Sequence, residues 1–105
     1  MAKVAINGLG RIGRACLKII INDPRLELVG VNDIGEPENI AYLLQYDSVY
    51  GRYPEKVAYA DGKLTIGDNT IPLYSERNPA DLPWGELGVD VVFESTGVFL
   101  SLIHI

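Results

Sequence analysis

Three glycines and one aspartate near the start of the chain have the types and spacing of a site for a nucleotide pyrophosphate. Gly8, Gly10 and Gly13 form the pattern G-x-G-x-x-G, and Asp33 follows Gly13 by 20 residues. The first two glycines permit a tight turn and a close approach of the pyrophosphate to the backbone. The third permits close packing of a helix on a strand. A carboxylate at this distance can accept hydrogen bonds from the hydroxyl groups of an adenosine ribose.

The elements around this motif are those that such a site requires. The apolar run 4–6 predicts a strand directly before the glycines. Behind them, apolar residues recur at helical spacing and predict an amphipathic helix over Arg11–Ile21. The buried stripe expected on this helix consists of Ile12, Ala15, Cys16, Ile19 and Ile20. A second strand is predicted over 26–32, which puts Asp33 at its end.

Together these features predict a dinucleotide site. A helix N-terminus offers unpaired N–H groups and a positive dipole end to phosphates. The carboxylate of Asp33 repels a 2′-phosphate, which favours NAD over NADP. The alternative is a glycine-rich turn in an unrelated α/β protein, with Asp33 only ending a strand, and it does not account for the combined context.

The rest of the chain adds an antiparallel segment to this pattern. Pro37 suits the first turn of a second helix, whose expected buried stripe is Ile40, Leu43 and Leu44. Asp61-Gly62 is a hairpin signal between the runs 56–60 and 63–66, and a further turn leads into 70–75. The run 89–94 predicts one more strand. The predicted fold class is α/β, a Rossmann-type parallel sheet with an inserted antiparallel meander.

Composition excludes several classes of partner. The 105 residues carry a net charge of -5 without a cluster of Lys and Arg, which argues against nucleic acid. The apolar stretches are too short to cross a bilayer, and no signal peptide is recognised. A single cysteine rules out an internal disulfide framework, so the predicted location is the cytoplasm.

Whole segments resemble the phosphorylating, NAD-dependent glyceraldehyde-3-phosphate dehydrogenases. The segments that carry the resemblance are 4–14 (VAINGLGRIGR), 46–53 (YDSVYGRY), 82–90 (LPWGELGVD) and 94–99 (ESTGVF). Erythrose-4-phosphate dehydrogenase shares several of these segments and is the alternative within the fold. The segments 32–35 and 50–53 look more like the glyceraldehyde enzyme.

The resemblance implies roles for residues of this chain. The backbone amides of Arg11 and Ile12 would hold the pyrophosphate, and Arg77 would lie beside the adenine end of the cofactor. Thr96 and Gly97 would lie near its middle. The complete set of residues expected to bind the cofactor is Gly8, Gly10, Arg11, Ile12, Gly13, Asp33, Ile34, Arg77, Thr96, Gly97 and Phe99. Ile34 and Phe99 are expected to line the adenine pocket. The resemblance further implies a sugar-phosphate substrate and a homotetramer for the whole enzyme.

Three residues have types that often carry out chemistry, but none of them is assigned a function here. Cys16 lies on the expected apolar stripe and is predicted to be a buried, inert thiol. Trp84 is predicted to anchor the core, and His104 lies in a tail outside the resemblance. The catalytic cysteine of the family belongs to an S-C-T-T-N motif that does not occur in these 105 residues. No catalytic residue is therefore assigned, and the chain alone is expected to be inactive.

The end of the chain raises separate expectations. Residues 1–99 are predicted to form a partial NAD-binding Rossmann domain, and 100–105 a tail outside the family pattern. The tail back-translates to the end sequence of a transposon adapter, so one hypothesis is that it is an artefact; a short apolar strand or helix start is the other. In the strand order 3-2-1-4-5-6 the strand at 89–94 is the fourth, and it is expected to be an unpaired edge. A stand-alone nucleotide-binding module and a non-functional truncated product are the remaining functional alternatives.

Overall fold

The structure, a computed structural model of the chain, describes residues 2–46, 55–77 and 82–95, together with the backbone of 101–104. Two helices and seven strands occur in these ranges. In chain order they are β1 (Ala2–Asn7), α1 (Arg11–Ile21), β2 (Leu26–Asn32), α2 (Pro37–Tyr46), β3 (Val57–Ala60), β4 (Lys63–Ile66), β5 (Asn69–Tyr74), β6 (Val91–Glu94) and β7 (Ser101–His104). The predicted helix Arg11–Ile21 and the predicted strand 26–32 are confirmed with the same bounds.

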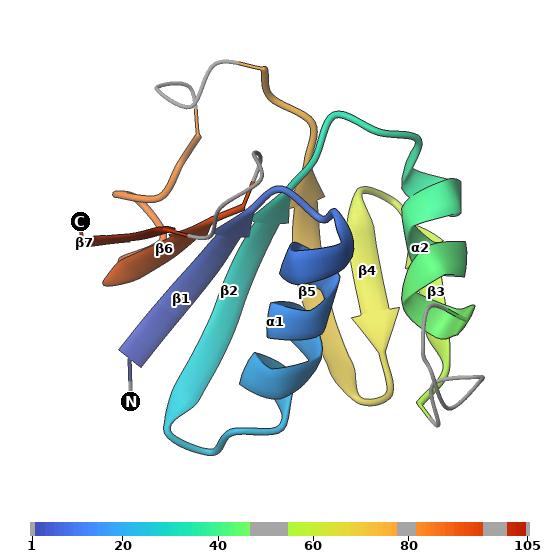
Figure 1. Cartoon of the computed structure of the whole chain (residues 1–105), viewed down its shortest axis with the longest axis horizontal. Coiled ribbons are helices and arrows are strands. Elements are labelled where there is room, and N and C mark those ends of the chain that lie inside the picture. Colours follow the sequence, from blue (N-terminus) through green and yellow to red (C-terminus); the bar gives the residue numbers. More distant parts are fainter. Residues whose placement is uncertain (1, 47–54, 78–81, 96–100, 105) are drawn as a thin grey trace.

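The strands form one sheet in the order β3-β4-β5-β2-β1-β6-β7 (Figure 1). Its middle, β5-β2-β1-β6, is parallel and has the 3-2-1-4 order of a Rossmann domain. β5 belongs to both parts of the sheet. Leu73 and Tyr74 pair in parallel with β2, whereas the start of β5 pairs antiparallel with β4. The predicted fold class is therefore confirmed, and the meander continues the parallel sheet through β5.

The meander owes its register to a two-residue turn and to one glutamine. Asp61 and Gly62 both have positive φ, at 52° and 77°, as a type I′ hairpin turn requires. The side-chain amide of Gln45, on α2, donates to the backbone oxygen of Glu55 and accepts from the backbone N–H of Val57. The predicted hairpin is confirmed, and Gln45 fastens the start of β3 to α2.

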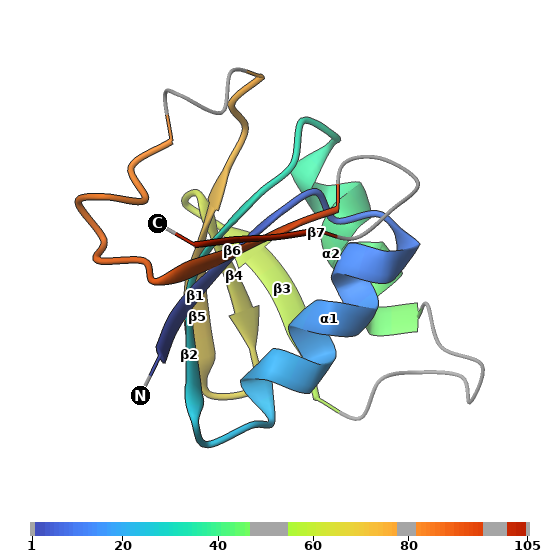
Figure 2. The same ribbon diagram turned by 60° about the vertical axis from the view of Figure 1, so that its left-hand side comes forward.

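Side chains alternate between the two faces of the sheet, and each face has its own core. Val4 and Ile6 of β1 pack towards the helices, in a cluster with Leu17, Leu44 and Ile71. Ala5 points to the opposite face, where the segment 82–89 covers the sheet. Figure 2 shows both helices on one side of the sheet and this segment on the other. The sheet therefore lies between two apolar clusters, of which the one on the helix side is larger.

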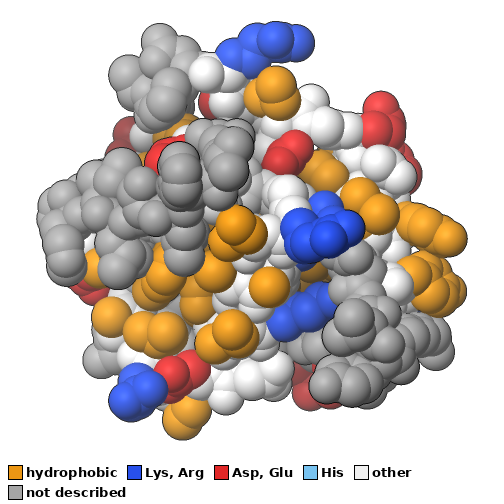
Figure 3. Space-filling view, in the orientation of Figure 1, with side chains coloured by type: hydrophobic (Ala, Val, Ile, Leu, Met, Phe, Trp, Pro, Cys, Tyr) orange, Lys and Arg blue, Asp and Glu red, His pale blue; other side chains and the backbone are white. Residues whose placement is uncertain are grey.

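The buried face of α1 differs from the predicted stripe. Gly13, Leu17 and Ile20 are buried, whereas Ile12 and Ile19 are 43% and 68% exposed. Apolar side chains consequently reach the surface on the face of the molecule that Figure 3 shows. The helix carries apolar residues over more than half its circumference, so their spacing alone does not select a face. Contact between Gly13 and the end of β1 selects it.

β6 is paired on both sides, so the expectation of an unpaired edge is wrong. β7 runs antiparallel to it, with Val91 opposite His104 and Glu94 opposite Ser101. On the other side β6 pairs in parallel with β1. Part of the tail is thus a short strand, as one of the two sequence interpretations proposed. Neither α1 nor α2 is long and apolar enough to cross a membrane, among the residues that the structure describes.

Candidate nucleotide-binding site

The glycine loop joins β1 to α1, and each of its glycines lies in a different environment. Gly8 has a φ of 100°, a conformation that residues with a side chain rarely adopt. A Cβ atom on Gly13 would overlap the carbonyl oxygen of Gly8 and would lie 2.8 Å from the Ser95 hydroxyl. A Cβ atom on Gly10 would meet nothing within 4 Å. Gly8 and Gly13 are thus required by the fold itself, while the position of Gly10 opens into free space.

The first turn of α1 has the properties of an anion site. Gly10 is the N-cap, no side chain caps the helix, and the first turn contains no acidic residue. Arg11 and Ile12, the first two residues of the helix, are exposed. Unpaired N–H groups at a helix N-terminus, together with the helix dipole, favour phosphate oxygens.

Asp33 lies directly beside the glycine loop. Its Oδ2 accepts a hydrogen bond from the backbone N–H of Leu9 at 2.6 Å, and its Oδ1 accepts one from the N–H of Gly35 at 2.8 Å. The carboxylate therefore ties the loop after β1 to the loop after β2. Each oxygen of an ionised carboxylate has two acceptor positions, so capacity for ribose hydroxyl groups remains.

A cleft of about 790 Å³ opens at this end of the parallel strands. The predicted residues that line it are Gly8, Gly10, Asp33, Ile34 and Arg77. Gly13 lies behind the loop, in contact with it, and Arg11 and Ile12 begin the adjoining helix. Thr96, Gly97 and Phe99 lie outside the described residues. The volume suits a cofactor-sized ligand, and its position at the carboxyl ends of the strands is where open α/β sheets bind ligands.

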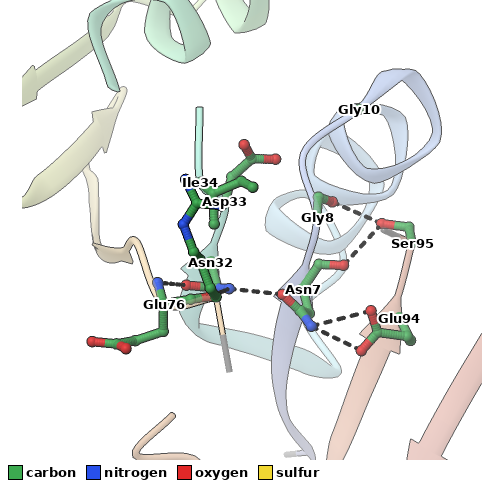
Figure 4. A pocket seen from close by; sticks show the side chains of 10 residues that line it. Asn7, Gly8, Gly10, Asn32, Asp33, Ile34, Glu76, Glu94 and Ser95 are labelled. Carbon is green, nitrogen blue, oxygen red and sulfur yellow. Dashed lines mark hydrogen bonds between the residues drawn. The ribbon is translucent and has the colours of Figure 1, made fainter. Parts of the chain in front are cut away.

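Sequence reasoning missed a row of polar side chains beneath this cleft. Asn7 and Asn32, 5% and 3% exposed, end neighbouring strands and stand opposite each other in the register of β1 and β2. The Nδ2 of Asn32 donates to the Oδ1 of Asn7 at 2.8 Å, and the Nδ2 of Asn7 donates to both carboxylate oxygens of Glu94 at 2.9 and 3.1 Å (Figure 4). The sequence did contain a signal for this row, because β1, β2 and β6 each end in a polar residue.

Two further residues extend this row. The amide of Asn32 makes two hydrogen bonds with the backbone of Glu76, accepting from its N–H at 2.8 Å and donating to its oxygen at 3.0 Å. Ser95 is buried, and its hydroxyl donates to the oxygen of Gly8 at 2.7 Å. Asn7, Asn32, Glu76, Glu94 and Ser95 all line the cleft. The network therefore connects the carboxyl ends of β5, β2, β1 and β6.

Of the residues assigned structural roles, Trp84 is buried as expected, whereas Cys16 is only partly buried. Cys16 is partly buried against the core below α1, and this burial raises the pKa of its thiol above the ordinary value. Trp84 is 7% exposed and makes an edge-to-face contact with Tyr74, with ring centroids 5.7 Å apart. The side chain of His104 lies outside the described residues. No three potential metal ligands gather anywhere in the described ranges.

Comparison with known proteins agrees with this geometry. The family model described as "Glyceraldehyde 3-phosphate dehydrogenase, NAD binding domain" matches residues 2–102. Proteins named glyceraldehyde-3-phosphate dehydrogenase 1 from Nostoc sp. and from Streptomyces arenae are 55% and 49% identical to the chain, each over 92% of its length. Glyceraldehyde-3-phosphate dehydrogenase of Thermotoga maritima is 48% identical over 94% of the chain.

The matched part is a minor share of each relative. The chain spans 28% of the Nostoc protein, 29% of the Streptomyces protein and 30% of the Thermotoga protein. The family match runs beyond residue 99, where the sequence analysis placed the end of the domain, and that boundary stays a prediction. Because the family model covers nearly the whole chain, the chain belongs to the family of NAD-binding domains of glyceraldehyde 3-phosphate dehydrogenase.

Proposed function

We propose that this chain binds NAD as the cofactor-binding portion of a phosphorylating glyceraldehyde-3-phosphate dehydrogenase. The observation that carries the proposal is the contact between Asp33 and the glycine loop in one open cleft. The amides of Arg11 and Ile12 hold the pyrophosphate, and the carboxylate of Asp33 accepts the hydroxyl groups of the adenosine ribose. Ile34 and Arg77, which are exposed and line the cleft, contact the adenine end.

The open space at Gly10 supports this assignment. The fold itself tolerates a Cβ atom there, whereas a bound pyrophosphate that approaches the backbone requires the position to be empty. Thr96, Gly97 and Phe99 complete the proposed set from the segment after β6. NAD, once bound, supplies the hydride acceptor, and the residues of this chain hold and orient its adenosine half.

The reaction of the whole enzyme is part of the same proposal. In it, a sugar-phosphate aldehyde is oxidised by NAD and released as an acyl phosphate, in glycolysis, by a cytoplasmic homotetramer. The groups that perform this chemistry are not among the residues assigned here, so we expect the isolated chain to bind NAD without turnover.

Isothermal titration of the chain with NAD tests the proposal. We expect saturable one-to-one binding that is tighter than binding of NADP. Asp33→Ala removes a charged acceptor, so it should weaken NAD binding by roughly tenfold or more, since such hydrogen bonds are worth about 1.5–3 kcal/mol. Asp68→Ala, an exposed aspartate in the turn between β4 and β5, is the matched control and should leave binding unchanged. Absence of saturable binding, or tighter binding of NADP, would refute the proposal.

A further inference from the structure

The amides of Asn7 and Asn32 are held in a single orientation by the groups at the two ends of their row. At one end stands the backbone N–H of Glu76, which can only donate, so the Oδ1 of Asn32 must face it. At the other end stands the carboxylate of Glu94, which when ionised can only accept, so the Nδ2 of Asn7 must face it. With both amides oriented in this way, the Nδ2 of Asn32 faces the Oδ1 of Asn7 and donates a hydrogen bond to it.

Asn32 uses this orientation to extend the pairing of two strands. Backbone pairing between β2 and β5 reaches Asn32 and Tyr74, and the N–H of Asp33 donates to the oxygen of Tyr74. The side chain of Asn32 then makes the next two hydrogen bonds, one to each polar group of the Glu76 backbone. The side chain of Asn32 thus holds the backbone at Glu76, just beyond the last backbone pair between β2 and β5.

Arg77 is the residue directly after this fixed point. It is exposed and lines the cleft. Its position relative to Asp33 therefore depends on the backbone at Glu76. Because Asn32 is buried and its amide makes three hydrogen bonds inside the protein, it has no donor left for a ligand.

We propose that Asn32 is a positioning residue for the cofactor, which acts through Arg77, and that Glu94 and Asn7 fix the orientation of its amide. The proposal rests on the assignment of Arg77 to the adenine end of NAD. Asn32 lines the cleft, but both of its N–H donors are used within the protein. It determines where the guanidinium of Arg77 stands before NAD arrives.

A double-mutant cycle measured by NAD titration tests this coupling. Arg77→Ala and Asn32→Ala should each weaken binding by about tenfold, while Asn32→Ala in the Arg77→Ala background should change it less than about twofold, because residues that act through each other are not additive. A merely structural role of Asn32 would lower stability and leave the affinity of the folded chain unchanged. Asn69→Ala, at the exposed first residue of β5, is the matched control.

Hydrogen exchange of the Glu76 amide gives a readout without ligand. Asn32→Ala should speed this exchange by about tenfold or more, because the N–H loses its acceptor. Asn32→Asp keeps the acceptor but removes both donors, so exchange at Glu76 should stay slow while NAD affinity falls. Glu94→Ala should weaken NAD binding, and Glu94→Gln, which still offers an oxygen to Asn7, should restore it.

The outcomes separate this inference from the proposed function. An unmodified chain without saturable NAD binding overturns both. NAD binding in which Arg77→Ala has no effect, or in which Asn32→Ala costs the same in both backgrounds, overturns the positioning role alone. An exchange rate of the Glu76 amide that is the same in Asn32→Ala as in the original chain also overturns it. If Asn32→Ala fails to fold, the isosteric Asn32→Asp serves in the same cycle.

Discussion

Gly13 touches the carbonyl group of Gly8 so closely that α1 and the end of β1 meet backbone to backbone. This contact fixes the height of the helix N-terminus above the sheet, and thereby the place where a phosphate would lie. Gly10, between them, has free space around its Cα. The fold therefore requires a glycine at position 13, whereas the proposed ligand requires a glycine at position 10.

Replacement of these glycines should separate the two demands. Gly13→Ala should lower the free energy of unfolding by about 1–3 kcal/mol or more, because a methyl group has no room there. Gly10→Ala should cost less, about 1 kcal/mol or below, because the methyl group has room and only the N-cap of α1 is weakened. Urea denaturation followed by circular dichroism measures both.

Titration of the same variants with NAD completes the comparison. Gly10→Ala should weaken NAD binding by about tenfold or more, equivalent to about 1.4 kcal/mol, because the methyl group enters the space of the pyrophosphate. Gly10→Ala with full affinity would contradict the assignment of this space to the cofactor.

Trp84 should contribute more to stability than any exposed aromatic residue in the part of the chain that the structure describes. Its ring lies against Tyr74 and so close to Gly30 that a Cβ atom there would be 2.9 Å from Cζ3 of Trp84. Trp84→Ala should therefore cost about 3–5 kcal/mol, the usual range for a buried tryptophan. Tyr42→Ala, at a side chain that is 60% exposed, is the control and should cost less than about 0.5 kcal/mol. Similar costs for the two variants would show that the segment 82–89 does not pack on the sheet.

The pairing of β7 with β6 predicts a change in association when β7 is removed. A chain that ends at residue 100 exposes the edge of β6, whose residues Val91, Val92 and Phe93 are apolar. Unpaired apolar edges recruit other strands, so we expect the shortened chain to form dimers or larger species at concentrations where the full chain does not. Size-exclusion chromatography with light scattering distinguishes them. A shortened chain that associates no more than the full chain would contradict a protective role of β7.

The pair Asp23–Arg25 predicts a pH dependence of stability. The hydrogen bond from the Arg25 side chain, with further help from its backbone N–H and its charge, lowers the pKa of Asp23 from 3.8 to about 2. The folded pKa lies below the unfolded one, so the pair stabilises the fold above about pH 4. This contribution is lost as the pH falls towards 2.

Asp23→Asn should therefore be less stable than the original chain at pH 7, and the difference should vanish near pH 2. Urea denaturation between these values measures it. The effect should be small and should shrink further in high salt, because the side chain of Arg25 is 85% exposed. A difference that persists unchanged at pH 2 would show that the carboxylate is not its source.

The spacing of residues determined much of the fold. Alternating strands and helices, the turn at Asp61-Gly62 and the glycine motif each depend on neighbours in the sequence, so α1, β2, the meander and the fold class followed from local patterns. The glycine motif and Asp33 likewise predicted a dinucleotide site, which parallel neighbouring strands can form because they end at the same edge of a sheet.

Other features depend on contacts between residues far apart in the chain. The apolar residues of α1 cover more than one face, and only the approach of Gly13 to Gly8 decided that Leu17 is buried and Ile19 exposed. The pairing of β7 with β6 could not be predicted locally, because a sequence pattern within one strand does not specify which strand pairs with it. The row Asn32–Asn7–Glu94 joins residues up to 87 positions apart in the sequence, and it exists only because β2, β1 and β6 end side by side. Local sequence thus determined the elements and the cofactor motif, whereas the polar network beneath the cleft required the tertiary structure, because hydrogen bonds form between atoms that folding brings together.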